Sequence, residues 1–147
     1  MNFKINDKVK YLNNILCEID SLYQSVLSNR KISDSEYVVL FSILELGEGC
    51  LQKDIINNSH INKKTTNSTI KKLEKNGLIK LQAGKYPNMH IFLTESGKKY
   101  VETNIIPIIN SETNVMEGVP DSEFAKLSTT YEKYIKIFKE EVQKLNK

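Results

Sequence analysis

Residues 51–97 constrain the fold of this chain more than any other segment. Two short helical patterns come first, and the second is rich in lysine and hydroxyl side chains and ends in LEKNGLI. The stretch IKLQAGKYPNMHIFLTESG follows, in which two strand patterns flank a turn before a new helix begins. A helix this small, polar and basic, held between neighbouring helices, suits insertion into a DNA groove. We therefore expect a helical lobe with a β-hairpin beside its basic helix.

Positive charge is concentrated in the same segment. The 147 residues have a formal net charge of +3, whereas residues 51–90 carry eight lysines against Asp54 and Glu74, a local charge of +6. The remaining residues therefore sum to −3. This asymmetry is typical of a surface that binds a polyanion, although a solvated lysine face has the same composition.

Composition argues against several other classes of protein. Cys17 and Cys50 are the two cysteines, too few for a disulfide framework. The first residues lack the apolar run of a signal peptide, and the longest apolar stretch, residues 38–44, is too short to span a bilayer. We therefore expect a cytoplasmic protein of one domain, with no membrane partner.

Residues suited to catalysis or metal binding are sparse. His60 and His90 are the two histidines, and no metal-ligand spacing connects them with the cysteines. We expect His60 in a turn and His90 on the hairpin. No acid/base constellation appears, so we expect neither an enzyme, a metal nor a cofactor.

Helical periodicity predicts two helices before the basic segment. Apolar residues at spacings of three and four predict a helix over about residues 7–28, at Leu12, Leu16, Ile19, Tyr23 and Val26. Ser33 and Glu36 form a capping-box pattern that opens a second helix, which Gly47 and Gly49 end. Its predicted apolar face comprises Tyr37, Leu40, Phe41 and Leu44.

Within the central segment, residues 51–58 predict a third helix, with Cys50 as a core residue at its start. Asn62 is a good N-cap for a fourth helix, whose inward positions are predicted to be Thr66, Ile70 and Leu73. Asn76 and Gly77 stop this helix. Residues 79–82 and 90–93 are the strand candidates, joined by a turn that contains Gly84 and Pro87-Asn88.

Two further helices are predicted after the hairpin. Thr94 caps the first of them, and Pro107 should kink or break it. Pro120-Asp121 begins a last helix with a long apolar stripe: Phe124, Leu127, Tyr131, Tyr134, Ile135, Phe138, Val142 and Leu145. Such a helix is not stable alone, so it must pack on the first helix, on a second copy, or on both. The predicted fold is mainly α with a small β-hairpin wing.

The outward positions of the fourth helix are the candidate DNA-binding residues. They are Lys63, Lys64, Thr65, Asn67, Ser68, Lys71 and Lys72, together with Lys85 and Tyr86 on the wing. Lysine ammonium groups neutralise phosphates, and short polar side chains reach phosphate oxygens or base edges. Asn67 is the best candidate for reading a base, because its amide can pair bidentately with adenine. Tyr86 is equally well explained as a turn residue that packs on the hairpin.

Two motifs carry a resemblance to a known family. LEKNGLI at residues 73–79 and HIFLTESGKKYV at residues 90–101 resemble MarR-type winged helix-turn-helix transcription regulators. In that family a Leu-Glu-x-x-Gly-Leu-Ile segment leads into the wing and a Leu-Thr-x-x-Gly segment opens the next helix. The resemblance implies a homodimer in which residues 1–30 and 100–147 form the dimerisation helices and residues 31–99 the DNA-binding lobe.

The resemblance also implies double-stranded DNA as a partner, with a pseudo-palindromic operator that mirrors the two-fold symmetry. We therefore expect a repressor relieved by a small ligand or another signal. The alternative is a winged-helix module that binds protein and not DNA. The chain departs from the family in a shorter wing turn, AGKYPNM, and in the absence of arginine from residues 51–90. DNA recognition should therefore depend on the fourth helix more than on the wing.

Two other features bear on packing and regulation. Ser59 and Thr66 occupy positions where the family prefers apolar residues, which predicts either looser packing of the helix-turn-helix or compensation by Ile56. An effector cleft lined by aromatic residues and Met116 is one hypothesis, and a packed core is the other; the residues are Tyr11, Tyr23, Tyr37, Phe41, Tyr100 and Met116. Cys17 on the first helix is expected to be an inert thiol in preference to an oxidant sensor.

Overall fold

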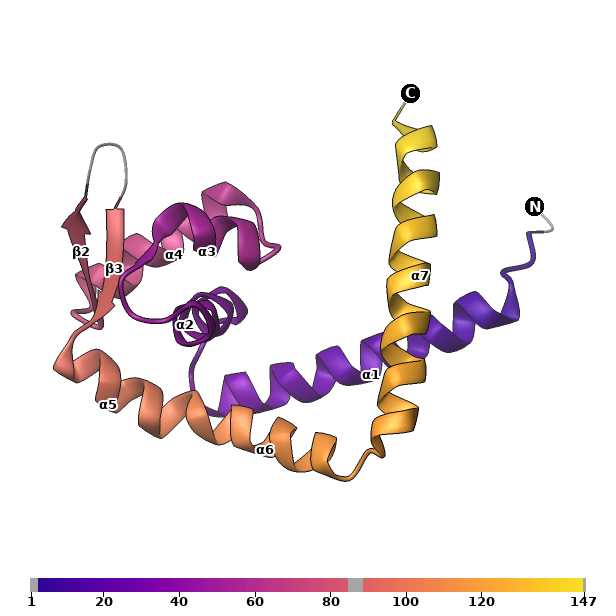
Figure 1. Ribbon diagram of the computed structural model, residues 1–147, viewed down its shortest axis with the longest axis horizontal. Coiled ribbons are helices and arrows are strands. Elements are labelled where there is room, and N and C mark those ends of the chain that lie inside the picture. Colours follow the sequence, from indigo (N-terminus) through magenta and orange to yellow (C-terminus); the bar gives the residue numbers. More distant parts are fainter. Residues whose placement is uncertain (1–2, 85–88, 147) are drawn as a thin grey trace. The chain divides into compact units, whose positions relative to one another are not determined.

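The computed structural model describes residues 3–84 and 89–146 (Figure 1). Its helices are α1 (Asp7–Asn29), α2 (Asp34–Leu46), α3 (Gln52–Asn58), α4 (Lys63–Lys75), α5 (Glu95–Asn104), α6 (Ile106–Glu117) and α7 (Asp121–Leu145). Its strands are β1 (Cys50–Leu51), β2 (Ile79–Ala83) and β3 (Met89–Leu93). The chain divides into two compact units, Met1–Ile108 and Ile109–Lys147. The observed elements confirm the predicted helices and both predicted strands.

The helices begin and end at the residues whose side chains satisfy their terminal backbone groups. Ser33 and Glu36 form the complete capping box at the start of α2. The Asn62 Oδ1 accepts a hydrogen bond of 2.8 Å from the Thr65 amide, and the Thr94 Oγ1 accepts one of 2.9 Å from the Gly97 amide. The capping side chains bind N–H groups that have no partner within their own helices. Because each cap lies only two or three residues before the amide that it binds, short sequence patterns locate the helix starts.

The core of the first unit lies between α2, α3, α4 and the sheet. Thr66, Ile70 and Leu73 on α4 are fully buried, as predicted. On α2 the predicted face is partly wrong, because Leu44 is 37% exposed while Val39 and Ile43 are fully buried. Since α2 contacts α1, α3 and α4, its buried surface is wider than one helical stripe. This packing presents the opposite, polar side of α4 to solvent.

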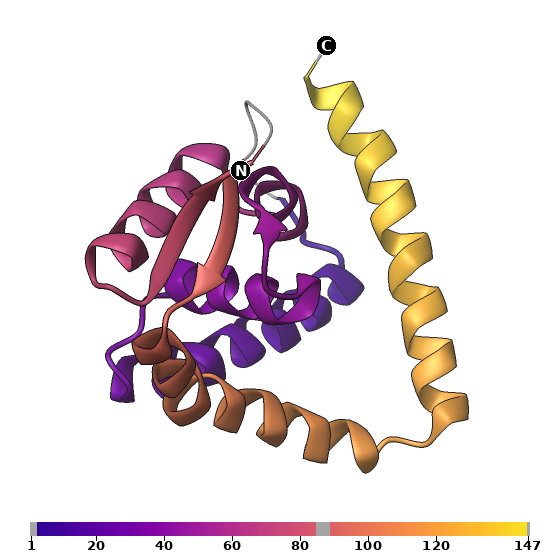
Figure 2. The same ribbon diagram turned by 60° about the vertical axis from the view of Figure 1, so that its left-hand side comes forward.

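The wing contains a strand that the sequence patterns did not indicate. Cys50 pairs with Ile91 and Leu51 with His90, so β1 joins β3 and β2 in an antiparallel sheet of order β1-β3-β2. Figure 2 shows β2 and β3 side by side next to α4. The placement of Cys50 at a helix start was wrong: it lies in a strand and is half-buried. A two-residue strand has no periodicity of its own and exists here because β3 supplies its partner.

The turn between the two helices of the helix-turn-helix contains a buried polar contact. The hydroxyl oxygens of Ser59 and Thr66 lie 3.5 Å apart, and the Thr66 hydroxyl also donates to the Asn62 carbonyl at 3.2 Å. Both hydroxyls are thus satisfied where apolar residues were expected. Of the residues on α3, Ile55 is fully buried, while Ile56, the residue named for compensation, is half-buried.

Gly97 is required by a close backbone approach. A Cβ placed on Gly97 would overlap the Leu78 carbonyl oxygen, a backbone atom that cannot move aside. Thr94 also binds this stretch, because its hydroxyl donates to the Gly77 carbonyl at 2.6 Å. The glycine of the LTESG motif therefore lets the start of α5 pack directly on the segment between α4 and β2.

Pro107 separates two helices, as expected. α5 ends at Asn104 and α6 begins at Ile106, which places Pro107 in the first turn of α6, where its missing N–H costs no hydrogen bond.

Apolar side chains remain exposed on α1 and α7. The predicted stripe of α7 includes Phe124 at 49% and Phe138 at 54% exposure, and α7 has no buried residue. On α1, Leu16 and Ile19 are each 45% exposed. Within the part of the chain that the structure describes, no helix combines the length and apolarity needed to cross a bilayer.

Candidate nucleic-acid interface

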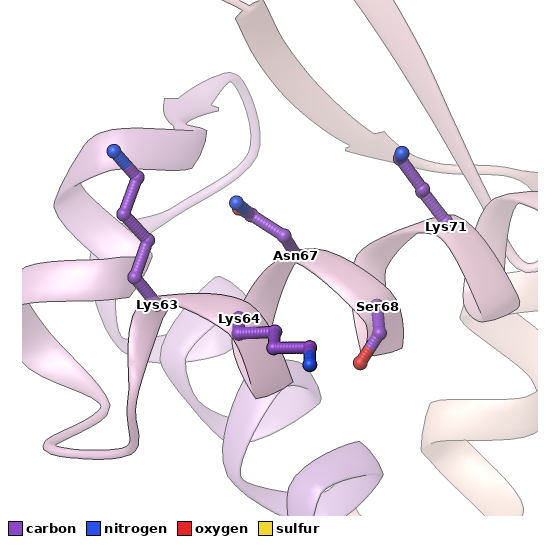
Figure 3. Close-up of a pocket in the computed structure, with 5 residues that line it drawn as sticks. All are labelled: Lys63, Lys64, Asn67, Ser68 and Lys71. Carbon is purple, nitrogen blue, oxygen red and sulfur yellow. The ribbon is translucent and has the colours of Figure 1, made fainter.

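The outward face of α4 forms a shallow, lysine-rich hollow of about 520 Å³. Lys63, Lys64, Asn67, Ser68 and Lys71 line it. Figure 3 shows Lys63, Asn67 and Lys71 extending on one side of the helix, while Lys64 and Ser68 lie on the adjacent side. Residues four apart share a face of an α-helix, which explains why Lys63, Asn67 and Lys71 lie together. The buried residues of the opposite face of α4 anchor the helix and thereby keep these side chains toward solvent.

Asn62 satisfies two amides in the first turn of α4. The Asn62 side chain takes the Thr65 amide, and the Asn62 carbonyl takes the Thr66 amide at 3.0 Å. The amides of Lys63 and Lys64 therefore remain at the positive end of the helix dipole, where an anion is favoured. Thr65 is half-buried beside them, and the Ser68 hydroxyl donates to the Thr65 carbonyl at 2.9 Å.

Lys72 points to the scaffold. Its Nζ lies 3.1 Å from the Glu36 Oε1, and the Glu36 side chain is only 10% exposed. The Glu36 Oε2 accepts hydrogen bonds from the Ser33 hydroxyl at 2.6 Å and the Ser33 amide at 3.1 Å. Next to this pair, the Thr69 hydroxyl donates to the Ser35 hydroxyl at 3.0 Å. The N-terminal turn of α2 thereby fixes the second half of α4.

The pKa of the Glu36 carboxyl is lowered. Burial by itself would raise the pKa of its carboxyl, but the hydrogen bonds from Ser33 and the nearby Lys72 ammonium together hold that pKa below its ordinary value. A carboxyl whose folded-state pKa is depressed stabilises the fold above its unfolded pKa, and this stabilisation disappears as the pH falls through the folded-state pKa.

We expect the substitution Glu36→Gln to lower the free energy of unfolding at pH 7 by about 1 kcal/mol, because the charged hydrogen bond to Lys72 is lost. The difference from the unmodified chain should shrink as the pH falls below the ordinary glutamate range of about 4.3, since Glu36 then becomes protonated in both states. Urea unfolding at several pH values measures both effects. Glu74→Gln, at an exposed position of the same helix as Lys72, is the control, and equal pH profiles for the two variants would contradict the assignment.

Asn67 has a partner that the sequence patterns did not indicate. The Gln52 Nε2, on the first residue of α3, donates to the Asn67 Oδ1 at 2.8 Å. Both residues are half-buried and stand fifteen positions apart. No local spacing connects them, so only the packing of α3 against α4 reveals the contact. The sequence signal for this contact was limited to a polar residue, Gln52, at the start of α3.

The predicted wing contacts, Lys85 and Tyr86, lie outside the described residues, as do Pro87 and Asn88 of the predicted turn. In the described part of the wing, the Lys80 Nζ lies 5.8 Å from the centroid of the Phe92 ring. A lysine at this distance makes a cation–π contact that supports the hairpin.

Three of the aromatic residues proposed to line an effector cleft pack against one another. The Tyr37 ring centroid lies 6.1 Å from that of Tyr23 and 6.1 Å from that of Phe41, so these three pack together. Tyr11 is 72% exposed in the single chain and is not part of this cluster. Met116 belongs to the second compact unit. Burial, with a smaller contribution from the Glu36 carboxylate, raises the pKa of Tyr100.

The cysteines and histidines have separate surroundings. Cys17 is exposed, and the Asn13 Nδ2 lies 3.7 Å from its sulfur. Burial and the Asp54 carboxylate raise the pKa of the Cys50 thiol, which disfavours its thiolate. The His90 Nδ1 lies 2.7 Å from the Gly49 carbonyl oxygen, and His60 has a positive φ of 54°. Over residues 3–84 and 89–146, no three His, Cys, Asp or Glu side chains come together as metal ligands.

A protein-family model and several solved structures resemble this chain. The model of the MarR family matches residues 32–84, from the residue before the α2 capping box to the residue after β2. The resemblance to MarR-type regulators is confirmed. No curated protein sequence matches the chain.

Solved structures of MarR-type regulators share the fold. A MarR family regulator from Neisseria meningitidis has 19% sequence identity and a TM-score of 0.81, over 97% of this chain and all of the other. MepR of S. aureus in complex with DNA has 18% identity and a TM-score of 0.70, over 92% and 99% of the two chains. BpsR of Bordetella bronchiseptica, whose DNA binding is regulated by 6-hydroxynicotinic acid, has 18% identity and a TM-score of 0.68, over 88% and 98%. The likeness in fold, which includes the winged helix-turn-helix, therefore extends over nearly the whole chain.

Proposed function

We propose that this MarR-type protein is a cytoplasmic homodimeric repressor that binds a pseudo-palindromic site on double-stranded DNA through α4. The observation that carries the proposal is the hollow on α4, where three lysines surround Asn67 and Ser68 on a helix whose opposite face is fully buried. A helix so held can enter the major groove while its lysines meet the flanking phosphates. The solved complex of the structurally similar MepR with DNA supports this reading.

Each outward residue of α4 has a distinct proposed part. Lys63, Lys64 and Lys71 neutralise phosphates, and the amides at the start of α4 add an uncharged phosphate contact. Asn67 contacts a base edge, and Thr65 and Ser68 allow the helix to approach the groove closely. Lys72 is proposed to act at the interface through its bond to Glu36, which fixes α4. Lys85 and Tyr86 would add phosphate contacts from the wing.

The exposed apolar faces support the proposed homodimer. The half-exposed stripe of α7 and the exposed leucine and isoleucine side chains of α1 leave more apolar surface uncovered than a monomer tolerates. We infer that residues 1–30 and 100–147 pair with the same residues of a second copy, around a lobe formed by residues 31–99. Two lobes related by a two-fold axis would then meet two half-sites about one helical turn of DNA apart.

Release by a small ligand completes the proposal. DNA binding by BpsR is regulated by 6-hydroxynicotinic acid, and PcaV of Streptomyces coelicolor is solved with its natural ligand. In the present chain, the packed rings of Tyr23, Tyr37 and Phe41 connect α1 with α2, so a ligand that separates them would shift the lobe against the dimerisation helices. No metal or catalytic group takes part in this proposal.

The decisive experiment selects binding sites from a random duplex library and then titrates salt. We expect a two-fold symmetric consensus, bound by a dimer, with an affinity that falls steeply as salt rises because several lysines displace counterions. A dimer that binds no duplex at low salt would contradict the proposal and favour a module that binds protein.

A further inference from the structure

The contact between Gln52 and Asn67 sets the direction of the side chain at the centre of the α4 face. Gln52 opens α3 and Asn67 lies midway along α4, so one hydrogen bond of 2.8 Å joins the two helices of the helix-turn-helix beneath the exposed surface. Both side chains are half-buried. A part-buried amide bridge of this kind restricts the side-chain rotation that a solvated asparagine would have.

The bond uses a specific atom of Asn67. Its Oδ1 accepts from Gln52, so the amide oxygen is turned toward α3. Its amino group stays available to a partner, and Figure 3 shows the end of the Asn67 side chain on the same side of α4 as Lys63 and Lys71. An amide nitrogen carries two hydrogens and can only donate. The centre of the hollow therefore presents a donor between two cations.

A donor distinguishes among the base edges of the major groove. Guanine offers two acceptors, N7 and O6, thymine offers O4, and adenine offers one acceptor, N7, beside its N6 donor, whereas cytosine offers only the donor N4. Bidentate pairing of Asn67 with adenine, the expectation from the residue type alone, needs the amide oxygen at the base. In this structure that oxygen is turned to Gln52.

We propose that Gln52 is a specificity-determining positioning residue, which holds the Asn67 oxygen and thereby directs the Asn67 amino group to a base with an acceptor, guanine foremost, and away from cytosine. Gln52 acts through Asn67 and does not itself touch a base. This inference rests on the proposed DNA binding. It specifies the base chemistry that the α4 face selects, and it names Gln52 of α3 as the residue that controls this selection.

The experiment compares base preferences selected from a random duplex library by the full-length protein and its variants. For the unmodified chain we expect guanine to be preferred and cytosine disfavoured at one position of each half-site, and Asn67→Ala should abolish that preference alone. Gln52→Ala should weaken the preference by about tenfold, within the discrimination of about 1–3 kcal/mol that one good base contact supplies. The double variant should resemble Asn67→Ala, because the two residues act on the same base.

Gln52→Glu gives the sharper test. A carboxylate can only accept, so Asn67 must turn its amino group to position 52 and present its oxygen to the base. The preference should then move to cytosine or adenine, which offer donors at N4 and N6. Asn57→Asp, at an exposed position of the same short helix, adds the same charge and should lower affinity without changing the preferred base.

The outcomes separate the inference from the function on which it rests. If Asn67→Ala removes a base preference that Gln52→Ala and Gln52→Glu both leave intact, the positioning role of Gln52 is wrong while DNA binding stands. If the unmodified dimer binds no duplex, the proposed function itself fails and the inference falls with it. Thermal unfolding of each variant by circular dichroism checks the fold, and Gln52→Glu keeps the test valid if Gln52→Ala unfolds.

Discussion

Replacing Lys63, Lys64 and Lys71 together with glutamine should lower the affinity for operator DNA by about 10³-fold at about 0.1 M salt. These three lysines line the hollow on α4, and none of them has a salt-bridge partner in the described part of the chain. Each phosphate that a lysine neutralises contributes about 0.9 to the slope of log affinity against log salt. Six lysines in a dimer should therefore reduce the magnitude of that slope by about five.

A matched triple variant controls for the loss of charge. Lys126, Lys133 and Lys136 lie on the side of α7 opposite its apolar stripe and are exposed, so their replacement with glutamine removes the same charge away from the proposed interface. Fluorescence anisotropy over a salt series measures both affinity and slope. Equal losses in the two triple variants would show that net charge, and not the α4 face, controls binding.

The second large effect is expected from the apolar stripe of α7. The substitutions Ile135→Asp and Phe138→Asp should convert the homodimer to monomers and abolish tight operator binding. Both side chains are about half exposed in the single chain, at 47% and 54%, and the proposed dimer would cover them. An isologous interface contains each residue twice, so four apolar contacts at about 1.5 kcal/mol each correspond to about 10⁴-fold in the dimerisation constant.

The control places the same aspartates on the polar side of α7, at Thr129 and Lys133. Sedimentation equilibrium gives the oligomeric state, and anisotropy with full operators and half-sites gives the affinity. The control should stay dimeric, while the Ile135→Asp and Phe138→Asp variant should bind full and half operators equally weakly. A stable dimer of that variant would place the two-fold interface elsewhere.

Local sequence patterns predicted much of the fold because helix starts depend on neighbouring residues. A hydroxyl or amide side chain caps the amides two or three residues ahead, so Ser33, Asn62 and Thr94 were sufficient to place α2, α4 and α5. The inward face of α4 followed from the helical period in the same way. The wider buried face of α2 did not, because three neighbouring helices cover it.

The candidate site was likewise predictable in part from local sequence patterns. The sequence indicated that α4 would present a basic, polar face, and the structure brings five of the predicted residues together around one hollow. The direction of individual side chains was beyond local reasoning. Lys72 turns to the buried Glu36 of α2, and Asn67 turns its oxygen to Gln52 of α3, since in both cases the partner lies on another helix.

By itself, then, the sequence determined where the helices begin, which face of α4 is buried and where positive charge collects, because each depends on residues within about one or two helical turns. The tertiary structure decided the rest. It paired β1 with β3, packed Gly97 against the Leu78 carbonyl, and joined Gln52 to Asn67. These contacts connect segments far apart along the chain, and they exist only once the core formed by α2, α3, α4 and the sheet holds those segments within hydrogen-bond distance.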